Sequence, residues 1–129
     1  MGLDVLLLKP TKDFSFDSWA DLQEGDLQPF NRREFSSVMM QHYPEFRENG
    51  DKGYLLLNQR MVEIFFGEDD QASTLVLNIH GKHQMDFVME LTTLLKCRAS
   101  TFEGQEMDET YIASFNQWRK RVAEPYEKE

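Results

Sequence analysis

One short pattern in this chain, His80-Gly81-Lys82-His83, combines residue types that could hold a ligand. The two imidazoles, the ammonium group and the flexible glycine are expected where a strand ends and a helix begins, and they could bind an anion with the free N–H groups of that helix. Alternatively, His80 and His83 could bind a metal with Asp86 or Glu90. A His-x-x-His spacing across a turn lacks the fixed face of two histidines on one helix, so an ordinary turn or a partner contact is the favoured interpretation.

Adjacent carboxylates offer a second kind of chemistry. Glu68, Asp69 and Asp70 follow one another in a predicted loop. Catalytic carboxyl groups generally need burial or a coupled partner, and a hydrated loop supplies neither. These three residues are therefore interpreted as solvated loop charge, and Glu63, inside a hydrophobic strand, is assigned to a mixed outer face of the sheet.

The sequence shows no motif for nucleophilic catalysis. It has no Gly-x-Ser-x-Gly and no glycine loop of the kind that cradles phosphate. Its single cysteine, Cys97, follows Leu94 and Leu95 at the end of a predicted helix, where it is expected to pack as a small apolar residue. One cysteine cannot form an internal disulfide or a thiolate zinc site. We therefore predict no enzyme, no cofactor and no metal.

The stretch from Asp13 to Gln28 is acidic and aromatic, with no basic residue. Such a surface is typical of a protein inhibitor that occupies a basic cleft, because charge steers the approach and aromatic side chains anchor the complex. The alternative is a solvated loop whose aromatic side chains pin it to the core. The predicted partner-binding residues, including the second acidic loop, are Asp13, Phe16, Asp17, Trp19, Asp21, Glu24, Asp26, Glu68, Asp69 and Asp70.

The first half of the chain predicts one inner strand, one loop and one helix. The apolar run Leu3 to Leu8 is typical of a strand covered on both faces. Asp13 to Gln28 fits neither period and is predicted as an irregular loop with one helical turn around Ser18 to Glu24. Asn31 can cap a helix over Arg32 to Tyr43, which Pro44 ends.

The second half predicts a three-stranded meander between helices. Tyr54 to Leu57, Met61 to Phe66 and Thr74 to His80 are strand-like, and alternation places Val62, Ile64 and Phe66 toward the core. A helix over Gln84 to Lys96, a short edge strand over Ala99 to Glu103 and a last helix capped by Asp108 follow. These elements predict one α+β domain over residues 1–129, a mostly antiparallel sheet of about four to five strands with helices on one face.

Composition restricts the kind of partner. The 129 residues carry 14 basic and 23 acidic side chains, a formal charge of −9, which repels nucleic acid and favours a basic protein surface. No apolar run is long enough to cross a bilayer, and Met1 to Pro10 has no secretion signal. We therefore expect a cytoplasmic protein with no membrane partner.

Two segments resemble a loose group of small bacterial proteins: the opening Met-Gly-Leu-Asp-Val, and Ser73 to Gly81 followed by an amphipathic helix and a strand ending at Glu103-Gly104. In size, acidity and α+β pattern the chain also resembles the immunity proteins that neutralise toxins used in bacterial competition. That resemblance implies a non-enzymatic inhibitor that occludes a cognate toxin. Where the looser group continues with glycines and an acidic residue, this chain has Lys82-His83-Gln84.

Two other functions remain open from the sequence. One is a small ligand- or metal-binding domain, in which enzymatic activity would use His80, Lys82 and His83. The other is a structural homodimer joined through an exposed sheet face or edge.

Overall fold

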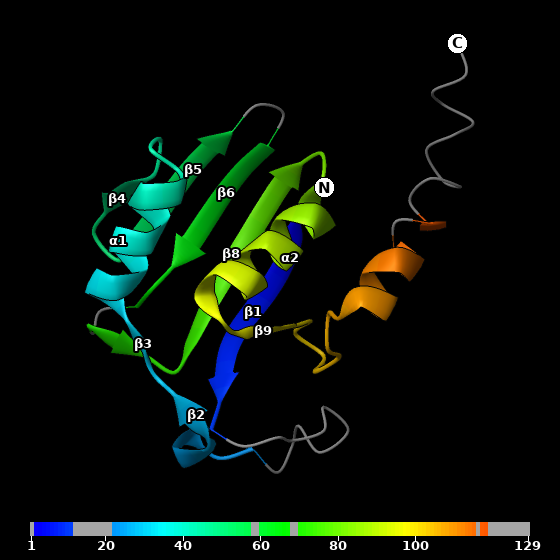
Figure 1. Ribbon diagram of the computed structural model, residues 1–129, viewed down its shortest axis with the longest axis horizontal. Helices are drawn as coiled ribbons and strands as arrows, with labels where there is room; N and C mark the ends of the chain where they lie inside the picture. The colour runs from blue at the N-terminus through cyan, green and yellow to red at the C-terminus, as the bar shows by residue number, and fades with distance from the viewer. Residues whose placement is uncertain (1, 12–21, 58–59, 68–69, 116, 119–129) are drawn as a thin grey trace.

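An antiparallel sheet with two helices over one face forms the centre of the molecule in the computed structural model (Figure 1). The structure describes residues 2–11, 22–57, 60–67, 70–115 and 117–118. In chain order the elements are β1 (Leu3–Pro10), the 3-10 helix η2 (Glu24–Asp26), β2 (Leu27–Gln28), β3 (Phe30–Asn31), α1 (Arg32–His42), β4 (Arg47–Asn49), β5 (Lys52–Leu57), β6 (Arg60–Phe65), β7 (Gln71–Ala72), β8 (Thr74–Gly81), α2 (Gln84–Leu95) and β9 (Arg98–Ser100).

The sheet confirms the predicted α+β class but has more strands than expected. Its order is β2-β1-β8-β6-β5-β4, β9 also pairs with β1, and β3 and β7 form a separate pair. The predicted irregular loop over Asp13 to Gln28 extends too far, because Leu27 and Gln28 pair with Pro10 and Lys9. Most of the helical turn predicted around Ser18 to Glu24 lies outside the described residues. Strands of two or three residues are too short to show an alternating pattern, so pairing with a neighbour alone defines them.

The central strands confirm the predicted meander. β5 and β6 are antiparallel neighbours, and β8 pairs with β6 in the same sense. β1 then lies between β8 on one side and β9 with β2 on the other, as expected of an inner strand. The expectation that both its faces are covered is wrong, because Asp4 is exposed and Leu6 is only partly buried. Val62, Ile64 and Phe66 are buried on the helix side, which confirms the predicted facing of β6.

Both helices begin and end close to the predicted positions. The Asn31 side chain accepts a hydrogen bond from the Glu34 N–H at 3.0 Å, so it caps α1 as predicted. α2 ends one residue earlier than expected, at Leu95. Val88, Leu91 and Leu95 of α2 join the core formed with the sheet and α1.

After α2 the chain returns to the sheet and then leaves it. The predicted strand over Ala99 to Glu103 is shorter, at Arg98–Ser100, because the chain folds back there: the Met107 N–H donates to the Ala99 carbonyl at 2.8 Å. Asp108 then caps a helical segment over residues 109–115, accepting from the Tyr111 N–H at 2.9 Å. Among the described residues, no helix combines the length and the apolar character needed to cross a membrane.

Candidate functional site

The face of the sheet that points away from the helices carries an exposed apolar surface. We call this surface the outer face. It consists of alternate side chains of β5, β6, β8 and β1, which the strand register arranges in three rows: Leu56, Met61 and His80; Tyr54, Glu63, Asn78 and Asp4; and Lys52, Phe65, Val76 and Leu6. Two apolar rows therefore flank one polar row.

Three large apolar side chains of the outer face are open to solvent. Leu56 is 71% exposed, and Met61 and Phe65 are each 39% exposed. Leu56 and Met61 are direct cross-strand partners, so their side chains stand next to each other. Exposed apolar side chains gathered in one place, rather than scattered singly, mark interaction sites on proteins.

Lys52 organises the aromatic side chains of this face. Its ammonium group lies 4.9 Å from the ring centre of Tyr54 and 5.1 Å from that of Phe65, and it forms an ion pair with Glu63. The hydrogen bond to Glu63 raises the pKa of Lys52. Lys52 neutralises Glu63 and contacts both rings. The rings of Tyr54 and Phe65 therefore lie beside an ion pair rather than beside a free carboxylate.

The other polar residues of the middle row are also paired. Asn78 of β8 donates a hydrogen bond from its amide to the Asp4 carboxylate of β1. The hydrogen bond between Asn78 and Asp4 therefore links β8 to β1, and the Lys52–Glu63 ion pair links β5 to β6 in the same way. Protein–protein interfaces typically combine paired polar groups with aromatic and methionine side chains.

The structure places the two histidines of the His80–His83 turn in different settings. His80 lies on the outer face opposite Met61. His83 adopts a left-handed conformation before α2, with φ at 58°, and its Nδ1 lies 3.3 Å from Asp86 Oδ2. Among the described residues no group of three or more His, Cys, Asp or Glu side chains is arranged to hold a metal ion.

A cluster formed by Arg60, Phe87, Tyr43 and Glu90 lies next to the same turn. Arg60 donates from Nη1 to the His83 carbonyl at 3.0 Å, and its guanidinium lies 4.9 Å from the ring centre of Phe87. Next to it, the Tyr43 hydroxyl donates to Glu90, and burial followed by this hydrogen bond raises the pKa of Tyr43. Sequence reasoning missed this cluster, because its members come from three separate elements.

Few of the predicted acidic partner-binding residues can be placed. Asp26 ends η2, where its carboxylate accepts from the Gln23 N–H at 3.1 Å and its carbonyl accepts from Thr11. Asp70 is exposed, and its carbonyl accepts from the Arg32 N–H at 2.8 Å. Glu24 opens η2. The rest lie outside the described residues: Asp13, Phe16, Asp17, Trp19, Asp21, Glu68 and Asp69.

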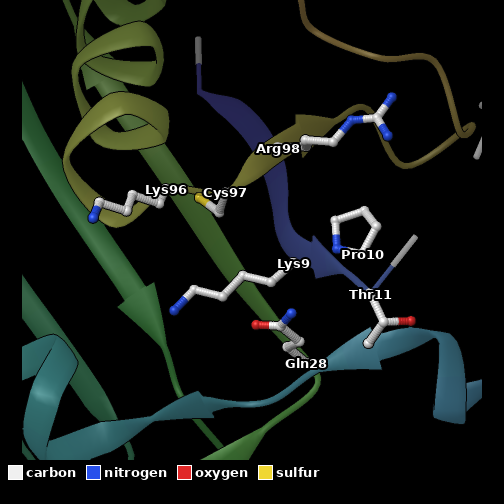
Figure 2. A pocket seen from close by; sticks show the side chains of 7 residues that line it. All are labelled: Lys9, Pro10, Thr11, Gln28, Lys96, Cys97 and Arg98. Atoms are coloured by element: carbon white, nitrogen blue, oxygen red, sulfur yellow. The ribbon is translucent and has the colours of Figure 1, made fainter. Parts of the chain in front are cut away.

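A hollow of about 520 Å³ lies at the other end of the sheet, beside the end of α2 (Figure 2). Its lining combines the end of β1 with β2 and the start of β9: Lys9, Pro10, Thr11, Gln28, Lys96, Cys97 and Arg98. Burial raises the pKa of the Cys97 thiol to about 12, so the thiol is neutral at ordinary pH. The sequence analysis did not predict this hollow, which depends on the pairing of β1 with β2.

In comparisons with protein-family models, with curated proteins and with solved structures, no match to this chain was found. Its function is therefore inferred from the residues themselves. The outer face and the hollow each combine residues from several elements.

Proposed function

We propose that this protein is a non-enzymatic binding protein that acts in the cytoplasm by covering a surface of a second protein. In its most concrete form it is an immunity protein that occludes a cognate bacterial toxin. The observation that carries the proposal is the outer face, where Leu56, Met61 and Phe65 are exposed on the same side of the sheet. Aromatic and methionine side chains on such a platform supply the anchors of an interface at little cost in conformational entropy.

The net charge indicates the kind of partner. A chain with a formal charge of −9 attracts basic protein surfaces and repels acidic ones at long range. Lys52 pairs with Glu63 at the centre of the outer face, so the surface around this pair is mainly apolar, while the Asp4 carboxylate adds negative charge on β1. Charge would then accelerate the encounter, and the apolar rows would hold the complex together.

Co-expression with the product of the adjacent gene tests this function. If that product is the toxin, cells that make it alone should stop growing, and cells that also make this chain should grow normally. The purified pair should elute as a single complex whose mass, from light scattering, is the sum of the two chains.

Two results would contradict the proposal. One is continued toxicity of the adjacent product in cells that contain equal amounts of this chain. The other is a concentration-dependent homodimer, seen by sedimentation, that buries the outer face and binds no second protein. The second result would assign the outer face to a copy of the same chain instead.

A further inference from the structure

The hollow shown in Figure 2 forms where β1 changes neighbours along one edge. Leu6 to Leu8 pair with β9, whereas Lys9 and Pro10 pair with β2. The two partner strands do not continue each other, so a gap opens between Gln28 and Arg98. The end of α2, with Lys96 and Cys97, lies beside this gap.

Basic residues from three separate places line the hollow. Lys9 comes from β1, Lys96 follows α2, and Arg98 begins β9. The Arg98 guanidinium forms two hydrogen bonds with the Glu106 carboxylate, at 2.7 and 2.8 Å, and in Figure 2 it points away from the other two cations. Among the described residues, neither the Lys9 nor the Lys96 ammonium group forms an ion pair.

A ring contact positions the Lys9 side chain, and a hydrogen bond positions the Lys96 backbone. The Lys9 ammonium lies 4.7 Å from the centre of the buried Phe30 ring. Lys96 has a left-handed backbone, with φ at 53°, and its N–H donates to the Thr92 carbonyl, so its attachment to the end of α2 is fixed. Figure 2 shows that the two side chains extend in the same direction, with the Gln28 amide near Lys9.

Among the residues that the structure describes, those that line the hollow carry no carboxylate. Cys97 contributes a neutral thiol, and the Thr11 hydroxyl donates to the Asp26 carbonyl at 3.1 Å. An adjoining hollow is lined by both lysines and by one described carboxylate, that of Glu34. Two ammonium groups against one carboxylate leave a local excess of positive charge in a strongly acidic chain.

We propose that this hollow binds the phosphate group of a small molecule, with the Lys9 and Lys96 ammonium groups and the Gln28 amide as the donors. A phosphate monoester carries about two negative charges and a diphosphate carries more, and both offer several acceptor oxygens to two ammonium groups that extend in the same direction. A volume of about 520 Å³ accommodates the group together with part of the molecule that carries it. This site is independent of the outer face and of the protein-binding function proposed above.

Titration of the full chain with inorganic pyrophosphate tests the proposal directly. The melting temperature should rise with pyrophosphate concentration, because a ligand that binds only the folded state stabilises it. In two-dimensional NMR spectra of the wild-type chain, the backbone amide signals of Thr11, Gln28, Lys96 and Cys97 should move, and those of His80 to His83 should stay in place. No rise in melting temperature, or shifts confined to the histidine turn, would overturn the proposal.

Charge-removing variants locate the site more sharply. Lys9→Met removes the ammonium group but keeps an unbranched apolar side chain beside Phe30, and Lys96→Asn keeps a residue that accepts a left-handed backbone. Each should weaken pyrophosphate binding about tenfold, and the double variant should abolish it. Lys82→Met, which removes the same charge from the exposed histidine turn, is the matched control and should bind like the wild type.

Two further outcomes contradict the proposal. Undiminished pyrophosphate binding by the folded double variant would exclude the two lysines as donors. Preference for a short single-stranded oligonucleotide over pyrophosphate would show that the chain recognises a nucleic-acid backbone rather than a small molecule.

Discussion

At Gly53 the core leaves no room for a side chain. A Cβ atom added there would lie 2.8 Å from two ring atoms of Phe46 and 3.0 Å from the Phe66 ring. Both rings are buried, and each packs edge-on against Phe35, at 6.1 and 5.3 Å between ring centres. The glycine in β5 is therefore a packing requirement of this aromatic cluster.

Gly53→Ala should destabilise the fold by about 1 to 3 kcal/mol, because the rings would have to leave their positions. Chemical denaturation followed by circular dichroism measures the loss. Gly25→Ala is the matched control, since a Cβ atom at Gly25 would meet nothing within 4 Å. Equal stability of the two variants would contradict the packing described at Gly53.

The pKa of Cys97 predicts a loss of stability at high pH. Burial raises this pKa from its usual 9.0 to about 12, so above pH 9 the unfolded chain releases a proton that the folded chain keeps. The contribution of the thiol is fully present below pH 9 and is lost as pH rises toward 12, by up to about 1.4 kcal/mol per pH unit.

Urea unfolding of the wild type and of Cys97→Ala at about pH 8 and about pH 11 isolates this effect, because the other titrating groups are common to both. The wild type should lose more stability than the variant between the two pH values. Parallel losses would show that the thiol titrates alike in the folded and the unfolded chain.

Individual side chains of the core could be predicted, but those of the candidate site could be only partly predicted. Alternation within β6 was enough to assign Val62, Ile64 and Phe66 to the core. Lys52 lies between Tyr54 and Phe65 because of the register of β5 against β6. The alternation of residues within a single strand does not determine that register.

At the scale of elements, the side chain of Asn31 caps the start of α1. The Asn31 side chain satisfies the Glu34 N–H, one of the donors that a helix start leaves without a partner. Asn31→Ala should destabilise the protein by about 1 kcal/mol. Gln41→Ala, on the exposed side of the same helix, should have little effect, and denaturation curves compare the two. If both variants were as stable as the wild type, the cap would contribute nothing.

Long elements were predictable, whereas of the strands of two or three residues only β9 was predicted, with different bounds. The helices and the strands β1, β5, β6 and β8 each carry at least six residues, enough to show their period. β2, β3, β4 and β7 carry two or three residues each, and only the partner strand defines them. The hollow borders one of these short strands, β2, so the hollow could not be predicted from the sequence either.

At the scale of the whole molecule, the acidic charge should control how fast the partner binds. Asp17, Asp21 and Glu24 belong to the most acidic stretch of the sequence. Replacing all three by Lys should slow association with the adjacent gene product and weaken its dependence on salt. Stopped-flow mixing at several salt concentrations measures both, and unchanged association rates would remove this stretch from the mechanism.

The affinity of outer-face variants for the adjacent gene product tests the central claim most directly. Met61→Ser and Phe65→Ser, combined in one chain, should raise the Kd about 100-fold or more if these side chains anchor the partner. Met40→Ser, which removes a methionine that is 49% exposed on α1, should leave the Kd unchanged. A folded Met61→Ser/Phe65→Ser variant that binds as tightly as the wild type would contradict the assignment of the outer face as the interface.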